Sequence, residues 1–205
     1  MGGTRMRSAE RLVDACHALA AAGLSPGRSG NVSVREGDRV LITATGAALR
    51  RLGPEHVAVL SLDGAHLTGP APTKEWALHR GAYRVRPDAG AIVHLHSRAA
   101  TALSCLPVAA EPDPLPAYTP YRIRMLGRVA LVAYAAPGSD ELARAVAAAA
   151  ASAHALLLAN HGSLVCGSDL EHAVDLAEEF EAAAELTLTL HGRGARVLDP
   201  ATAWR

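Results

Sequence analysis

The sequence has 205 residues with 20 basic and 20 acidic side chains, and 50% of its residues are apolar. This length and composition predict one folded domain and exclude a disordered chain. Zero formal net charge and 3% aromatic residues argue against a nucleic-acid-binding protein, which needs a basic face and stacking surfaces.

Membrane and secreted classes are also disfavoured. No apolar stretch approaches the length of about 18 residues that crosses a bilayer, and residues 1–14 are interrupted by charges where a signal peptide has its apolar core. Three widely spaced cysteines predict reduced thiols and therefore a cytoplasmic protein. Histidine, with ten copies, is the unusual residue, so we look for function there.

The first half of the chain predicts a helix, a hairpin and a second helix. Apolar residues at helical spacing over 12–19, followed by Gly23, predict an amphipathic helix. Two short β-rich segments, 32–34 and 40–42, flank a polar turn and predict a hairpin. We expect the second helix from about residue 73 to residue 86, ended by Pro87.

The second half predicts alternating strands and helices. An alanine run at 145–151 is typical of a helix packed closely on a sheet. The other expected elements are a strand at 91–96, a helical stretch to residue 106, an irregular proline-rich connection at 111–121, strands at 129–134 and 155–158, and a long helix at 169–190. Together with the hairpin, these elements predict a mixed sheet covered by helices.

Two histidines, His94 and His96, fall on the expected strand 91–96. Because side chains alternate along a strand, both imidazoles point to one face and can bind one divalent metal. Such a pair alone belongs more often to a surface or a core, so a catalytic site needs a third ligand. His161 is the best third ligand, because it directly follows the strand 155–158 and precedes a glycine; taken alone, it is an ordinary turn histidine.

Glu75 lies at the start of the second expected helix. Free N–H groups and the helix dipole stabilise a carboxylate there, which explains Glu75 without any function. Beside a metal, the same carboxylate would bind the ion at rest and act as a base in catalysis.

Two turns of small and hydroxyl-bearing residues, 27–31 and 43–46, bracket the hairpin. Their backbone N–H groups and hydroxyls suit a phosphate, although ordinary hairpin turns have the same composition. Neither turn matches the P-loop or the dinucleotide fingerprint, so a nucleotide is disfavoured.

Taken together, these segments resemble the class II aldolase/adducin family over about residues 12–190. The matching motifs, in order, are 29–35 (SGNVSVR), 42–46 (ITATG), Glu75 with His79 and Tyr83, 86–88 (RPD), 93–97 (VHLHS), 160–162 (NHG), and Glu178, Glu179 and Glu181 of the closing helix.

The resemblance implies an α/β fold: one three-layer α/β/α domain over residues 1–205, with its core at about 12–190 and a mixed, mostly antiparallel central sheet. It also implies a homotetramer with active sites at the subunit interfaces, acting on a small phosphorylated sugar or sugar acid. Partners such as nucleic acid or a membrane are not expected.

The resemblance further implies the site residues. One divalent metal per subunit, usually zinc, would lie on His94, His96 and His161, with Glu75 as a further ligand and as the acid/base. The implied phosphate-binding positions are Asn31, Thr45, Gly46 and Thr73. A tyrosine in the mid-chain loop would donate a proton; Tyr121 fits that place best, and Tyr118 stays an alternative. This donor set accepts Mn²⁺ or Fe²⁺ as well as Zn²⁺.

Departures from the aldolase pattern favour one branch of the family. Lys74, the segments 118–121 and 126–128 and a short C-terminal tail resemble enzymes that decarboxylate 3-oxo-tetronate 4-phosphate. That reaction gives dihydroxyacetone phosphate and CO2 through a metal-bound enediolate, which makes the chain a carbon–carbon lyase. Lys74 would add a cation suited to a substrate with both carboxylate and phosphate; without that role it is a solvated lysine.

The main alternative is an aldolase of the L-fuculose-1-phosphate type, whose retro-aldol cleavage leaves the same enediolate and releases an aldehyde. An epimerase or dehydratase of the family is less favoured. A non-catalytic scaffold like adducin is disfavoured most, because all three metal-binding histidines are present.

Overall fold

The computed structural model describes residues 2–107, 113–199 and 201, and it is built on one eight-stranded sheet. The strand order is β4-β3-β2-β1-β5-β8-β7-β6. The strands are β1 (Asn31–Glu36), β2 (Arg39–Thr43), β3 (Val57–Ser61), β4 (His66–Thr68), β5 (Ala91–Leu95), β6 (Val129–Val132), β7 (Ala155–Leu158) and β8 (Gly162–Gly167). Only β6 and β7 pair in parallel; the other neighbours are antiparallel.

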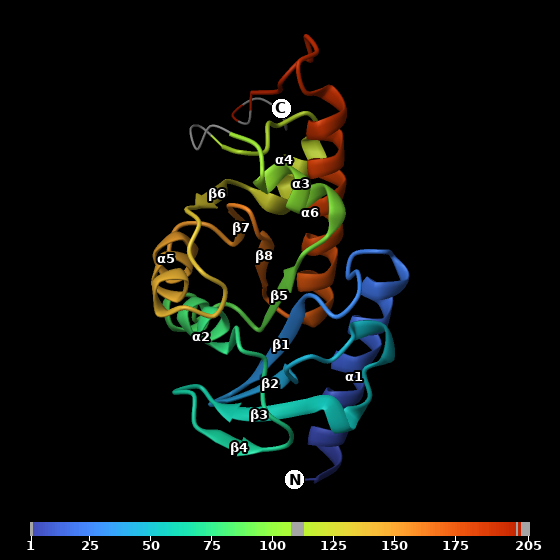
Figure 1. Cartoon of the computed structure of the whole chain (residues 1–205), viewed down its shortest axis with the longest axis vertical. Helices are drawn as coiled ribbons and strands as arrows, with labels where there is room; N and C mark the ends of the chain where they lie inside the picture. The colour runs from blue at the N-terminus through green and yellow to red at the C-terminus, as the bar shows by residue number, and fades with distance from the viewer. Residues whose placement is uncertain (1, 108–112, 200, 202–205) are drawn as a thin grey trace.

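Helices cover both faces of the sheet (Figure 1). The helices are α1 (Gly2–Ala21), α2 (Trp76–Val85), α3 (Arg98–Ser104), α4 (Pro120–Leu126), α5 (Asp140–Ala150) and α6 (Leu170–Leu190), with short 3-10 turns at Leu49–Arg51 and Pro54–His56. Alternation along β5 separates the two cores: Ile92 packs with α2 and α5, whereas Val93 packs with α1, α3, α4 and α6. The three-layer α/β/α arrangement with a mixed, mostly antiparallel sheet is therefore confirmed.

Most elements expected from the sequence are present, with shifted ends. The hairpin forms β1 and β2, and the strands expected at 91–96, 129–134 and 155–158 form β5, β6 and β7. The second helix begins at Trp76 rather than at about residue 73, because Glu75 is its N-cap. Residues 145–150 of the alanine run lie in α5, and Ala151 is its C-cap. The helix starts earlier than the run because the Ser139 side chain caps it by accepting from the backbone N–H of Leu142.

One expectation was wrong in part, and three strands were missed. Residues 120–121 belong to α4 rather than to an irregular connection, because proline is well suited to the first turn of a helix and Thr119 caps it. Residues 111–112 lie outside the described part of the chain. The missed strands are β3, β4 and β8. Among the described residues, no helix is both long and apolar enough to cross a bilayer.

Gly90 sits where β1, β5 and β8 meet, at the start of the strand that carries the paired histidines. Its N–H donates to the carbonyl of Gly167 at 2.9 Å, and its carbonyl accepts from the N–H of Arg35 at 2.8 Å. A Cβ added at Gly90 would lie well inside the contact distance of the Ser168 carbonyl oxygen. The close approach of these backbones therefore requires glycine.

We predict that Gly90→Ala destabilises the fold by about 1–3 kcal/mol, because the backbone of residue 168 has to move. Urea unfolding measures this change. The control is Gly194→Ala, where an added Cβ meets nothing within 4 Å and the unfolding midpoint should not shift. Equal midpoints for both variants would contradict the close packing at Gly90.

Candidate metal centre

His94 and His96 face each other at the end of β5. The backbone partner of His94 on β1 is Asn31, and on β8 it is Leu164, so this histidine lies in the middle of the sheet. His96 directly follows the last residue of the strand. The two Nε2 atoms are 3.1 Å apart and the ring centroids 4.9 Å apart, so both imidazoles point to one face as the sequence predicted.

A tight turn between β7 and β8 brings His161 to the same place. Asn160 has a φ of 53°, and a Cβ on Gly162 would collide with the Leu95 carbonyl, so the turn approaches the end of β5 very closely. The ring of His161 lies 4.9 Å from that of His94 and 4.7 Å from that of His96, measured between centroids. The turn glycine thus permits three imidazoles to meet.

The Glu75 carboxylate lies next to two of the three histidines. Its Oε1 lies 3.1 Å from Nε2 of His161, and its Oε2 lies 3.3 Å from Nε2 of His94. One ligand atom from each of Glu75, His94, His96 and His161 lies within 4.8 Å of the others. The structure therefore brings together all four residues that the sequence suggested as metal ligands.

The donor atoms fit a divalent metal. Nδ1 of His94 is 2.7 Å from the Ser163 carbonyl, which can only accept, so the proton is on Nδ1 and the lone pair of Nε2 faces the cluster. Oε1 of Glu75 and both ring nitrogens of His161 are buried without a hydrogen-bond partner. Three imidazoles and one carboxylate with orphaned buried atoms are a donor set for zinc, manganese or iron.

The pKa values of Glu75 and His96 are both shifted toward the protonation state that binds a metal. Burial alone would raise the pKa of Glu75, but the nearby imidazoles of His161 and His94 and the hydrogen bond from Asn31 outweigh it and hold the pKa well below its usual range. Burial, with His94 and His161 nearby, lowers the pKa of His96 to about 4. At neutral pH the cluster therefore offers a carboxylate and a neutral imidazole.

A cavity of about 260 Å³ adjoins this cluster. All five positions expected to bind phosphate or substrate line it together with Glu75 and His96: Asn31, Thr45, Gly46, Thr73 and Lys74. Arg28 lines it too and was missed as a site residue, because the turn at 27–31 was interpreted from its small and hydroxyl-bearing residues. Pro137 and Gly138, which follow β6, complete another part of the wall.

The two tyrosines considered as proton donors stand apart from this cavity. Tyr121 is in the first turn of α4 with 54% of its surface exposed, and Tyr118 is two residues before that helix. Neither belongs to the residues that line the cavity within this chain.

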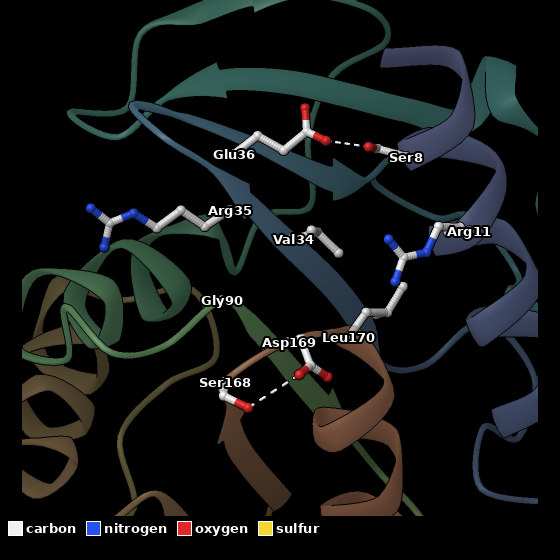
Figure 2. Close-up of a pocket in the computed structure, with 9 residues that line it drawn as sticks. All are labelled: Ser8, Arg11, Val34, Arg35, Glu36, Gly90, Ser168, Asp169 and Leu170. Atoms are coloured by element: carbon white, nitrogen blue, oxygen red, sulfur yellow. Dashed lines mark hydrogen bonds between the residues drawn. The ribbon is translucent and has the colours of Figure 1, made fainter. Parts of the chain in front are cut away.

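A second hollow, of about 220 Å³, lies between α1, β1 and the start of α6 (Figure 2). Its polar groups bond to one another or to close neighbours: Ser8 donates to Glu36, and Arg11 pairs with Glu171 at 2.7 Å. The figure shows no histidine there, and the metal-ligand cluster found among the described residues lies elsewhere. The cavity of about 260 Å³ beside the three histidines is therefore a better candidate for the functional site than this second hollow.

Comparison with known proteins shows the family that the sequence motifs resemble. The model of the class II aldolase and adducin N-terminal domain matches residues 10–188. A 3-oxo-tetronate 4-phosphate decarboxylase from Haemophilus influenzae is 43% identical over 177 residues, 86% of this chain and 84% of that protein. An L-fuculose phosphate aldolase from Escherichia coli is 39% identical over 187 residues, 90% of this chain and 84% of the relative.

Solved structures show the same fold. YgbL from Escherichia coli, whose activity is given only as aldolase/epimerase/decarboxylase, superposes with a TM-score of 0.92 at 36% identity, covering 96% of this chain and 95% of that one. An L-fuculose 1-phosphate aldolase superposes with a TM-score of 0.85 at 33% identity, covering 93% and 90%.

We predict that His94→Ala and His96→Ala each lose the metal, because the remaining ligands no longer enclose the ion. Metal content per chain, measured by elemental analysis after dialysis, should fall from about one to near zero. His66→Ala is the control, since His66 is exposed on β4 and lies outside the cluster. Full metal content in either site variant would contradict the assignment of ligands.

Proposed function

The chain belongs to the class II aldolase and adducin family and is a lyase, and on that premise we propose that it is a 3-oxo-tetronate 4-phosphate decarboxylase. The products would be dihydroxyacetone phosphate and CO2. We propose one divalent metal per subunit, with zinc the preferred ion, held by His94, His96, His161 and Glu75.

The observation that carries this proposal is the composition of the cavity wall. Glu75 is the only carboxylate among the described residues that line it, and it lies at the histidine end. Two cations, Lys74 and Arg28, lie among the small residues and hydroxyls of the remaining wall. One acid/base group, a metal site and two cations suit a substrate with a reacting ketone, a carboxylate and a phosphate.

The decarboxylation breaks one carbon–carbon bond. The carboxylate carbon leaves as CO2, and its bonding electron pair passes through C2 to the C3 carbonyl oxygen, which gives an enediolate. Addition of one proton at C2 then completes dihydroxyacetone phosphate. A divalent metal bound at the cluster would act as a Lewis acid that polarises the ketone.

The protein side chains would handle the proton and the phosphate. Glu75, ionised in the resting site, takes up a proton and delivers it to C2. Thr73 Oγ1 accepts from the N–H of Glu75 at 3.3 Å, so its hydroxyl hydrogen is left to donate to a phosphate oxygen. Thr45 and Gly46, in the turn at 43–46, would contact the same phosphate.

An L-fuculose-1-phosphate-type aldolase is the second candidate, favoured by the relative that is 39% identical over 90% of this chain. Retro-aldol cleavage would use the same cavity and the same Glu75. In both cases we propose a homotetramer in which Tyr121 of one subunit donates or relays a proton in the cavity of its neighbour, which accounts for its exposed position.

We predict that Glu75→Gln lowers kcat by about 100-fold or more, because the acid/base group is lost. The metal should stay bound, since three histidines still hold it and the glutamine amide oxygen replaces the carboxylate oxygen, whereas alanine offers no ligand atom. Steady-state kinetics and elemental analysis measure the two effects. Glu171→Gln, which removes only the exposed ion pair with Arg11, is the matched control. Unchanged turnover in Glu75→Gln would contradict the role of Glu75.

A coupled assay for dihydroxyacetone phosphate distinguishes the two activities. The metal-loaded protein receives either 3-oxo-tetronate 4-phosphate or L-fuculose 1-phosphate, and the common product gives one readout for both. We expect kcat/KM to be at least about tenfold higher for the oxo acid, which corresponds to about 1.4 kcal/mol of transition-state stabilisation. A preference for the sugar phosphate would make the chain an aldolase and overturn the proposal.

A further inference from the structure

Buried polar side chains form a hydrogen-bonded chain that begins at Oε2 of Glu75, whereas Oε1 of Glu75 faces His161. Asn31 Nδ2 lies 2.9 Å from Oε2 of Glu75, and Asn31 Oδ1 lies 2.5 Å from Nε2 of His79. Nδ1 of His79 is 2.8 Å from Ser33 Oγ, which is 2.9 Å from the hydroxyl of Tyr83. His79 and Tyr83 belong to the motifs that match the family, but the sequence alone indicates no role for them.

The secondary structure explains why these side chains meet. Asn31 and Ser33 are two residues apart on β1 and therefore share one face, while His79 and Tyr83 are four residues apart on α2 and share another. All four are at most 4% exposed. Asn31 is also the β-sheet partner of His94, so the chain is anchored beside the metal cluster.

The chemistry of each group fixes the direction of every hydrogen bond. Because the Glu75 carboxylate only accepts, Nδ2 of Asn31 donates to it, which leaves Oδ1 of Asn31 as the acceptor facing His79. Nε2 of His79 therefore carries the proton, and Nδ1 accepts from the Ser33 hydroxyl. The Ser33 oxygen in turn accepts from Tyr83.

His79 stays neutral in this chain, as this direction requires. Burial, with His94 nearby, lowers the pKa of His79 to about 3. A neutral imidazole with both nitrogens bonded has one tautomer, so it presents a fixed donor to Asn31. Every donation in the chain thus points toward Glu75.

We propose that His79, acting through Asn31, is a positioning residue that fixes the Glu75 carboxylate for proton transfer. Oε2 is held by Asn31, which leaves the unbonded Oε1 as the oxygen directed toward His161. Glu75 is the N-cap of α2, but its side chain makes no capping hydrogen bond that would orient it instead. This inference rests on the proton-transfer role of Glu75 in the proposed function.

Two substitutions at His79 test the proposal. In His79→Gln the side-chain amide nitrogen extends to about the position of Nε2 and can still donate to Asn31. His79→Leu fills the space but removes the donor. Ser33→Ala is a milder third variant, which removes the hydroxyl that fixes the tautomer and keeps a small buried side chain.

The readouts separate positioning from folding and from substrate choice. Metal content and the thermal midpoint report on folding, and kcat and KM are measured with the better of the two substrates. A third readout is the exchange of a hydroxymethyl proton of dihydroxyacetone phosphate for deuterium in D2O, followed by NMR, which reports proton transfer alone. In this exchange a base removes the proton, the electron pair moves to the carbonyl, and a deuteron returns to carbon. Decarboxylase and aldolase share this partial reaction.

For His79→Leu we expect kcat and the exchange rate to fall about tenfold or more, with KM within about threefold of wild type and about one metal per chain. His79→Gln should restore both rates to within about threefold of wild type, and Ser33→Ala should lie between the two. If His79→Leu does not fold, the comparison of Ser33→Ala with His79→Gln decides.

Three results would overturn this role. Wild-type rates in both His79→Leu and Ser33→Ala would show that Glu75 needs no support. Equal losses of rate, metal and thermal midpoint in His79→Gln and His79→Leu would show a structural role only. A wild-type protein that exchanges no deuterium would contradict the proposed function itself, and the role of His79 would fall with it.

Discussion

The candidate site depends on the cost of burying four potential metal ligands whose polar atoms form hydrogen bonds with one another only in part. Three imidazoles and the carboxylate of Glu75 converge in the interior, and three of their polar atoms have no hydrogen-bond partner. An unsatisfied buried polar group costs about 1–3 kcal/mol. A bound cation would relieve part of this cost by accepting a lone pair from Glu75 and one from a ring nitrogen of His161, so the same arrangement that weakens the empty fold would create affinity for a metal.

The sheet enforces this convergence through its register. His94 is held between Asn31 on β1 and Leu164 on β8, while the neighbouring Val93 packs in the opposite core. Slipping β5 by one residue would turn the histidine into that apolar core and expose the valine face to the site. Core packing on both faces therefore also fixes the geometry of the metal ligands.

Local sequence patterns predicted the candidate metal ligands more completely than they predicted the strands of the sheet. His94 and His96 were predictable because alternation on a strand needs no distant partner, and Glu75 because it directly precedes a helical pattern. The strand β8 (Gly162–Gly167) was not predicted, because it begins and ends with glycine. The role of His79 was also not readable, since its hydrogen-bond partners lie on β1, more than forty residues earlier.

We propose that Glu75, His94, His96 and His161 form one metal site. X-ray absorption at the metal edge of the zinc-loaded protein tests this directly. We expect a first shell of nitrogen and oxygen only, at about 2.0–2.2 Å, with the outer-shell scattering of three imidazoles. Sulfur at about 2.3 Å, or a shell with fewer than three imidazoles, would contradict it.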